Sequence, residues 1–201
     1  MKRFFSIHSY NMVKMFLNQF ATAIFGFALV LAAGSAKNVF LRNASSCFAI
    51  LFYLFLLYTM TWEIGFRDRV GVLHGSKPNQ PWKGAVISLF ANSLNILLAI
   101  FVTLGSLLPK TAFASIGGVC KVIALLSEGM YMGVLANRVG NVQLNSQWFM
   151  FFVIILPAVL VCGLAYLFGL KDVKFTAGVN RQQYPESDRE PKRKKDRTHE
   201  D

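Results

Sequence analysis

The residues best suited to chemistry form a polar stripe within the apolar segment 85–108. Spacings of three, four and seven place five small or polar residues on one face of a helix: Ser88, Asn92, Asn95, Ala99 and Ser106. An amide in apolar surroundings is costly unless it is hydrogen-bonded, so this face should turn toward other helices or a wet cavity. The stripe therefore predicts either hydrogen bonds that fix helix packing or a path for a solute or ion.

A pair of charged residues, Lys121 and Glu128, interrupts a second apolar segment, 112–136. Seven residues apart, they share one helical face and lie about 10.5 Å apart along the axis. The lysine side chain should lean toward the helix N-terminus, away from Glu128, which disfavours a direct bond. Each charge is therefore expected to find water or a partner on another helix.

The polar run 63–84 offers a third kind of site. Glu63 and Arg67 are four residues apart with the acid first, an ion pair that indicates a helix continuing beyond the preceding apolar stretch. Glycines and a proline in residues 71–78 should end this helix. Four charged residues are candidates for a loop that docks a cytoplasmic partner, the alternative being a solvated anchor: Glu63, Arg67, Asp68 and Arg69.

The sequence carries no signature of catalysis or of metal binding. It lacks Gly-x-Ser-x-Gly, His-Glu-x-x-His and a phosphate-binding loop ending in Gly-Lys. The three histidines are scattered, and each of the three cysteines lies in an apolar segment without a Cys-x-x-Cys partner. We therefore expect a protein that is not an enzyme and that has no cofactor and no metal.

Four long apolar stretches dominate the chain: residues 12–34, 44–62, 85–108 and 149–169. Hydrophobic residues make up 54% of the sequence and charged residues 15%, against about 25% charged in soluble proteins. Each stretch can cross a hydrocarbon core about 30 Å thick as a helix, which satisfies its own backbone hydrogen bonds. The expected fold is an all-α, multi-pass transmembrane bundle over residues 1–178, with the first stretch kept as an uncleaved span.

The basic residues predict the orientation in the cell membrane. With four spans, and with 112–136 re-entrant or interfacial on the outer side, sixteen of the 21 Lys and Arg residues share the side of both termini. A fifth span at 112–136 would reduce the best split to twelve against eight. The positive-inside rule therefore favours four spans over five and places both termini in the cytoplasm.

The four-span topology also orients the segment 112–136. We expect its small, charged face to look toward the bundle or the outer aqueous boundary, and its large apolar face toward lipid. The small residues beside Lys121 and Glu128 are Ala114, Gly117, Gly118 and Ala124. The large apolar residues are Ile116, Val119, Ile123, Leu126, Met130 and Val134.

Residues 179–201 are predicted to form a disordered, charged cytoplasmic tail, since they have no apolar periodicity to offset the entropy of ordering. Residues 185–201 hold six basic and six acidic side chains, so this part is locally neutral. The net charge of +11 therefore lies beside the spans. This distribution is typical of membrane topology and argues against a nucleic-acid partner.

Small residues mark the expected close contacts between helices: Gly26, Ala28, Ala32, Gly129 and Gly133. Pro157 lies in the last stretch and should kink its helix, because it removes the hydrogen bond to Val153. These packing motifs and the lack of catalytic groups favour an accessory or scaffold subunit that docks a membrane-protein partner or another copy of itself. The alternative is a small oligomeric transporter or channel that uses the polar face of 85–108 with Lys121 and Glu128.

Overall fold

The computed structural model describes residues 2–35, 38–76 and 78–173, with side chains described from Ser9 onward. The predicted tail 179–201 lies outside these residues. As the sequence predicts, the described chain is mainly helical. Its α-helices are α1 (Lys2–Ser35), α2 (Val39–Leu73), α3 (Lys83–Ala91), α4 (Ser93–Leu107), α5 (Ala112–Ser127), α6 (Met132–Leu135), α7 (Met150–Val153) and α8 (Leu156–Leu170). Two 3-10 turns complete the helical elements: η1 (Gly129–Tyr131) and η2 (Leu144–Ser146).

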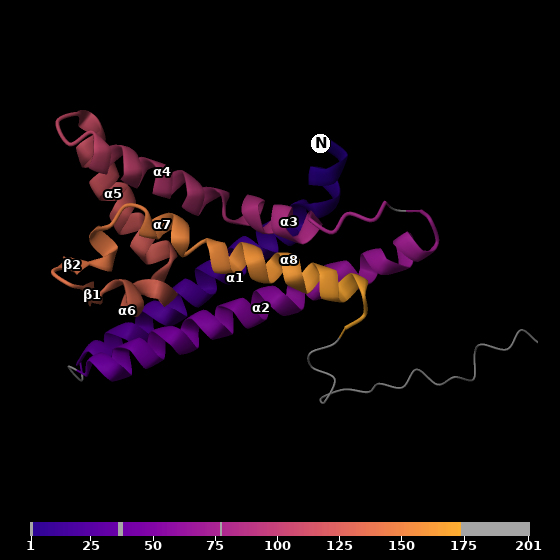
Figure 1. The fold of residues 1–201 in the computed structure, drawn as a ribbon, viewed down its shortest axis with the longest axis horizontal. Helices are drawn as coiled ribbons and strands as arrows, with labels where there is room; N and C mark the ends of the chain where they lie inside the picture. Colours follow the sequence, from indigo (N-terminus) through magenta and orange to yellow (C-terminus); the bar gives the residue numbers. More distant parts are fainter. Residues whose placement is uncertain (1, 36–37, 77, 174–201) are drawn as a thin grey trace, which may run out of the picture.

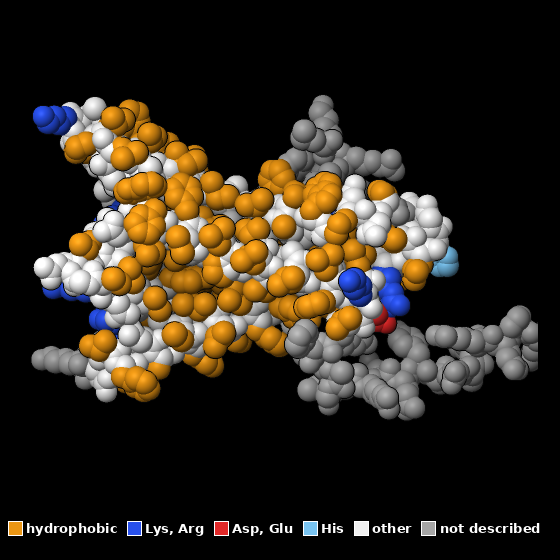
Figure 2. Space-filling model, viewed as in Figure 1, with side chains coloured by type: hydrophobic (Ala, Val, Ile, Leu, Met, Phe, Trp, Pro, Cys, Tyr) orange, Lys and Arg blue, Asp and Glu red, His pale blue; other side chains and the backbone are white. Residues whose placement is uncertain are grey.

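Three of the described helical segments are long and apolar enough to cross a membrane: Ser9–Ser35, Val39–Leu73 and Met150–Leu170. Two bent pairs raise the number of candidates to as many as five if each pair is one span. Hydrophobic side chains cover the middle of the face seen in Figure 2, and the Lys and Arg side chains on it lie toward the two ends. This distribution of apolar and charged side chains is the one that a lipid bilayer requires.

The long helices run back and forth between the two ends of the molecule (Figure 1). The N-terminus, the α2–α3 connection and the end of α8 lie at one end, and the α1–α2 and α4–α5 connections lie at the other. A contact between side chains supports this order, because Lys83 at the start of α3 pairs with Asp68 near the end of α2 at 2.5 Å. α2 packs along α8, and α4 packs along α5.

The stretch 85–108 is not one continuous helix, contrary to the prediction. α3 and α4 meet at Asn92 with a bend of 61°. The Asn92 Nδ2 atom donates to the Ser88 carbonyl oxygen over 3.0 Å, and this oxygen also accepts the backbone hydrogen bond of Asn92. A side chain that competes for a backbone acceptor in this way disturbs a helix.

The segment 112–136 breaks more sharply, by 84°, between α5 and the η1–α6 pair. The break falls at Glu128, whose backbone leaves the helical region at φ −111° and ψ 33°. Both ends of the segment lie at the end of the molecule that holds the α1–α2 connection (Figure 1). Just beyond α6, Asn137 accepts a hydrogen bond from Arg42 over 2.8 Å and donates one to Asn43 over 3.0 Å, both in the first turns of α2.

The last apolar stretch is interrupted where Pro157 predicts a kink. α7 ends at Val153 and α8 begins at Leu156, so the proline sits in the first turn of the second piece. A proline is tolerated there because the first turn of a helix has no acceptor for its missing N–H.

A short hairpin between α6 and α7 is an addition to the predicted all-α fold. Strands β1 (Arg138–Val139) and β2 (Val142–Gln143) pair antiparallel, with Val139 opposite Val142. The two-residue connection begins at Gly140, which has φ +62°. A Gly-Asn dipeptide between two valines is the sequence signal for such a turn.

Glycines allow the helices to touch backbone to backbone. A Cβ atom on Gly129 would lie 2.4 Å from the Ala23 carbonyl oxygen in α1, and one on Gly133 would lie 2.8 Å from the Arg42 carbonyl oxygen in α2. Gly26 in turn lies directly against Met130. The predicted motif Gly129-x-x-x-Gly133 is therefore used inside the chain, whereas Ala28 and Ala32 are exposed on α1.

Two adjacent glycines in α5 provide a matched test of this packing. A Cβ atom on Gly117 would lie 2.7 Å from the Gly105 Cα atom of α4, whereas one on Gly118 would meet nothing within 4 Å. We expect Gly117→Ala to lower the thermal midpoint in detergent by several degrees, and Gly118→Ala to keep or raise it, since Ala favours a helix by about 1 kcal/mol over Gly. Equal midpoints for the two variants would contradict the close approach of α4 and α5.

Candidate functional site

A buried carboxylate lies at the break between α5 and η1. Glu128 is only 3% exposed. Its Oε1 atom accepts a hydrogen bond from Asn95 Nδ2 over 2.6 Å and another from Gln19 Nε2 over 3.0 Å. Residues far apart in the sequence, from α1, α4 and the α5–η1 junction, therefore meet at one oxygen atom.

The hydrogen-bond network continues from Glu128 along the predicted polar stripe. Asn95 donates to the Asn92 Oδ1 atom over 3.2 Å and accepts from the Ser127 hydroxyl over 2.9 Å. Asn92 contacts the backbone and, at 3.5 Å, the hydroxyl of Ser88. Ser88, Asn92, Asn95 and Ala99 are 1%, 2%, 6% and 0% exposed, so the stripe lies in the interior as far as Ala99. Ser106, at its far end, is exposed.

The second oxygen of Glu128 has a different environment. Its Oε2 atom is buried and has no hydrogen-bond partner among the described residues, and the same holds for the hydroxyl of Tyr131. Both tyrosines of this region, Tyr53 and Tyr131, interact electrostatically with Glu128. One oxygen of the carboxylate is thus held by two amides, and the other has no hydrogen-bond partner in the described part of the chain.

The helix break and the glycine contacts position this carboxylate. Glu128 caps the C-terminus of the 16-residue helix α5, where carbonyl groups and the helix dipole contribute partial negative charge. The next residue, Gly129, sits directly against Ala23 of α1, which brings Glu128 to Gln19 one turn away. The site therefore places an ionisable carboxyl group at the negative end of a helix, an arrangement that attracts cations.

Glu128 differs from the other acids in the described ranges because it has no basic partner there. Asp68 pairs with Lys83 at 2.5 Å, and Asp172 pairs with Arg69 at 2.5 Å. Glu63 pairs with Arg67 on the exposed surface of α2. Removing an ion from water costs several kcal/mol, so a buried carboxylate without a counterion needs a proton or a cation to neutralise it.

The carboxylate also lies far from both ends of the neighbouring helix. Along the candidate span Ser9–Ser35, its partner Gln19 is about 15 Å from the first residue and about 24 Å from the last, at 1.5 Å per residue. In a helix that crosses a bilayer, a position this far from both ends lies at the depth where transport proteins bind their substrates. An ionisable residue at such a depth is a functional-site candidate by default.

A groove of about 240 Å³ lies beside the network, between α1, α4 and α5. Three polar residues of the network line it: Gln19, Asn95 and Ser127. The remaining lining is apolar: Phe16, Phe20, Leu94, Ile123 and Leu126. Gln19 and Asn95, the polar partners of Glu128, therefore lie at the edge of a groove whose surface is almost entirely apolar.

The structure brings together four of the five residues predicted for a polar path or packing site, namely Ser88, Asn92, Asn95 and Glu128. Lys121 is separate, because it is half-buried two turns earlier in α5 and makes no salt bridge to an Asp or Glu of the described chain. Gln19, Tyr53, Ser127 and Tyr131 were not predicted as part of the site. The two adjacent amides Asn18 and Gln19 in the first apolar stretch are the signal that identifies one of them.

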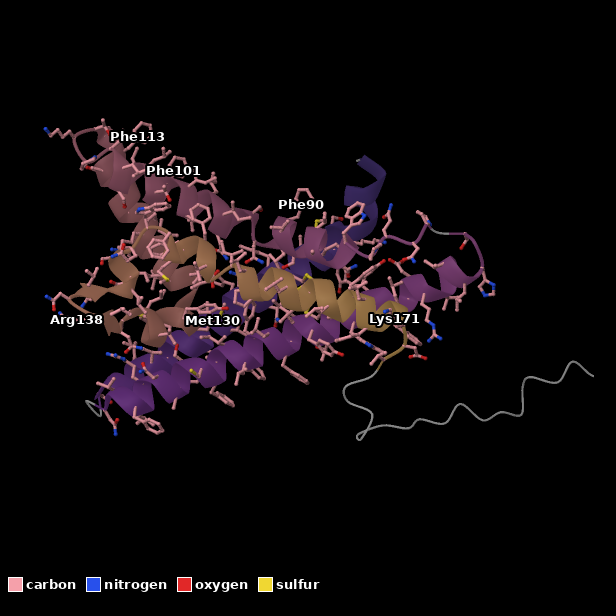
Figure 3. The ribbon with its side chains drawn as sticks, viewed as in Figure 1. Phe90, Phe101, Phe113, Met130, Arg138 and Lys171 are labelled. Atoms are coloured by element: carbon pink, nitrogen blue, oxygen red, sulfur yellow. The ribbon has the colours of Figure 1, made fainter. Side chains whose placement is uncertain are left out.

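The predicted faces of the segment 112–136 require two corrections, at Gly118 and at Met130. Gly117, Ala124 and Glu128 are buried and Ile116, Val119, Ile123 and Leu126 are exposed, as predicted, but Gly118 is exposed. Met130, which was placed on the lipid-facing side, is fully buried and lies in the interior of the molecule, while Arg138 and Lys171 mark opposite ends (Figure 3). The bend at Glu128 turns the residues after it inward, so a single helical wheel does not describe them.

The candidate docking residues separate into two groups. Glu63, Arg67 and, in part, Arg69 reach the surface near the end of α2. Asp68 does not, since it is 5% exposed and binds Lys83 and the Tyr166 hydroxyl, the latter at 3.0 Å. The prediction was therefore wrong for Asp68, because the helix turns this side of α2 toward α3 and α8.

Comparison with known proteins gives no relative. The chain matches no protein-family model, no curated protein and no solved structure. Within the described ranges, no three His, Cys, Asp or Glu side chains are grouped in a way that could hold a metal ion. The site must therefore be interpreted from its own geometry and charge.

Proposed function

We propose that this is a multi-pass protein of the cell membrane that binds a cation at Glu128 and moves it across the bilayer. In this proposal four segments span the membrane: the apolar part of α1, α2, the α3–α4 pair and the α7–α8 pair. The α5–α6 segment enters from the outer side and returns to it, and both termini are cytoplasmic. Short chains of this kind act as oligomers when they transport, so a second copy is the expected partner.

The re-entrant course is supported by the side-chain contacts at the two ends. Lys83 ties the start of α3 to the end of α2, so α4 ends at the end of the molecule that holds the start of α2. Asn137, just after α6, binds Arg42 and Asn43 at that same start. A segment that enters and leaves at one end places its bend, and therefore Glu128, inside the molecule.

The observation that carries the proposal is the buried carboxylate without a basic partner. Buried hydrogen bonds alone would fix helix packing, as Asn92 and Ser88 do, without any charge. A carboxylate at the negative end of a broken helix, with one oxygen left without a hydrogen-bond partner among the described residues, favours a cation instead. The broken helices α3–α4 and α5–η1 give this site the discontinuous backbone found in secondary transporters.

The rival hypothesis of an accessory or scaffold subunit has less support. It draws on the small-residue motifs, and Gly26, Gly129 and Gly133 are occupied by contacts within the chain. Ala28 and Ala32 remain on the exposed side of α1. These two residues do not favour a scaffold, because a helix surface that faces lipid is apolar as well. A packing role gives no reason for a buried charge.

Transport by liposomes that contain the purified full chain tests the proposal. Sodium, potassium, ammonium, methylammonium and benzyltrimethylammonium are offered one at a time, and uptake is compared with that of empty liposomes. We expect at least one cation to enter faster than in the empty liposomes. Glu128→Gln should reduce this uptake at least tenfold, because the amide keeps the hydrogen bonds of Oε1 but loses the charge.

Glu63→Gln is the matched control, since it removes an exposed acid from the same chain. Its uptake should equal that of the unchanged protein. The proposal is overturned if none of these cations is moved, or if Glu128→Gln moves them as fast as the unchanged protein does.

A further inference from the structure

We infer that the cation is a small hydrophobic ammonium compound that reaches Glu128 sideways, from the lipid, through the groove between α1, α4 and α5. This inference rests on the proposed function, because it names the class of cation and the route to the same carboxylate. It is carried by the position of the groove, the apolar composition of its walls and the carboxyl group that lies behind Gln19 and Asn95.

The groove opens on the apolar outer surface. Residues on its rim are well exposed on the side of the molecule, with Phe20 at 53%, Leu94 at 41% and Leu126 at 52%. In the proposed topology this surface faces lipid, at about the depth of Gln19. A hydrated alkali ion does not travel through hydrocarbon, whereas an organic cation with an apolar body does.

The walls of the groove match the two parts of such a ligand. The side chains of Phe16, Phe20, Leu94, Ile123 and Leu126 suit an apolar or aromatic body. Phenylalanine rings also attract ammonium groups through their faces. A volume of about 240 Å³ is slightly below the usual range of ligand pockets, about 300–1,000 Å³, which indicates a small compound.

Gln19 and Asn95 separate the groove from the charge of Glu128. Both line the groove and both donate to the same carboxylate oxygen. Glutamine has a flexible side chain, so a rotation of Gln19 would expose the carboxylate to the groove. The ammonium group of the ligand then takes the place of the glutamine N–H beside the oxygen, and the site keeps its electrostatic partner.

Binding of radiolabelled benzyltrimethylammonium to the purified full chain in lipid nanodiscs tests this inference. This probe has a permanent charge and an aromatic body and cannot lose a proton. We expect saturable binding that Glu128→Gln weakens at least tenfold. Leu94→Trp, which fills the groove, should also weaken binding at least tenfold.

Leu97→Trp is the matched control, because Leu97 is 49% exposed on the same helix but does not line the groove. Its affinity should stay within twofold of the unchanged protein. Thermal midpoints of both tryptophan variants are measured as well, and a Leu94→Trp chain that fails to fold is replaced by Leu126→Trp at the opposite wall.

The possible results separate this inference from the proposed function. If sodium, potassium or methylammonium binds in a manner that depends on Glu128 and benzyltrimethylammonium does not, the ligand class is wrong and the proposed function stands. If Leu94→Trp binds as tightly as its control Leu97→Trp, the lateral route is wrong. If lipid co-purifies with the chain and benzyltrimethylammonium does not displace it, the groove binds an acyl chain and the inference is wrong. If no cation depends on Glu128, both proposals fall.

Discussion

Lys83→Met is expected to lower the free energy of unfolding by about 3–5 kcal/mol, the usual cost of removing one partner from a buried ion pair. The Lys83 ammonium group lies 2.5 Å from the Asp68 Oδ2 atom, and the two side chains are 11% and 7% exposed. The variant therefore leaves the buried carboxylate without this lysine. The Tyr166 hydroxyl still donates to the same oxygen, which supplies a hydrogen bond but no charge.

The effect should be large because this contact joins three helices. Asp68 lies near the end of α2, Lys83 begins α3 and Tyr166 belongs to α8. Unfolding in a graded mixture of mild detergent and sodium dodecyl sulfate measures the change. Arg67→Met is the control, since its pair with Glu63 is exposed and such pairs contribute about 0–1 kcal/mol.

A double variant distinguishes the ion pair from simple packing. Asp68→Leu with Lys83→Met removes both charges at once, and apolar replacements of a buried pair are often neutral. We expect the double variant to recover most of the stability that Lys83→Met loses. A single-variant loss no larger than that of Arg67→Met would contradict the burial of this pair.

Glu128→Gln is expected to raise the free energy of unfolding by about 1–2 kcal/mol while it abolishes cation binding. The amide oxygen can accept the hydrogen bonds that Asn95 and Gln19 now give to Oε1. The amide N–H group replaces Oε2, an acceptor without a partner in the described chain, and has the tyrosine hydroxyls nearby. Removal of a functional but costly group commonly stabilises a protein by this amount.

The same unfolding assay measures this gain, and Glu128→Leu serves as its control. Leucine removes the charge but leaves the amides of Asn95 and Gln19 without their acceptor, so this variant should be less stable than Glu128→Gln. A loss of more than about 1 kcal/mol for Glu128→Gln would show that the charge itself holds the structure together. The site would then be structural, and the cation proposal would lose its main support.

Local patterns in the sequence predict the helices and their apolar faces, because both depend on residues close together in the chain. The lengths of the apolar stretches and the 3.6-residue period were enough to anticipate helices near α1, α2, α4 and α8. Ser88, Asn92 and Asn95 could be placed on one buried face for the same reason. Pro157 likewise predicted the interruption before α8 from a single missing N–H group.

The partners of those faces depended on contacts that no local pattern encodes. Gln19 and Asn95 meet Glu128 across separations of 109 and 33 residues, and they do so because Gly129 lets α1 approach the bend. Asp68 was placed on the surface because it lies in a charged segment, whereas packing against α3 and α8 buries it. Met130 was misplaced because a helical wheel assumes a straight helix, whereas the axis turns at Glu128. The sequence alone thus determined an apolar helical protein with an energetically costly acid at position 128. The tertiary structure decided the surroundings of this acid, which are amides and, in the described chain, no basic side chain.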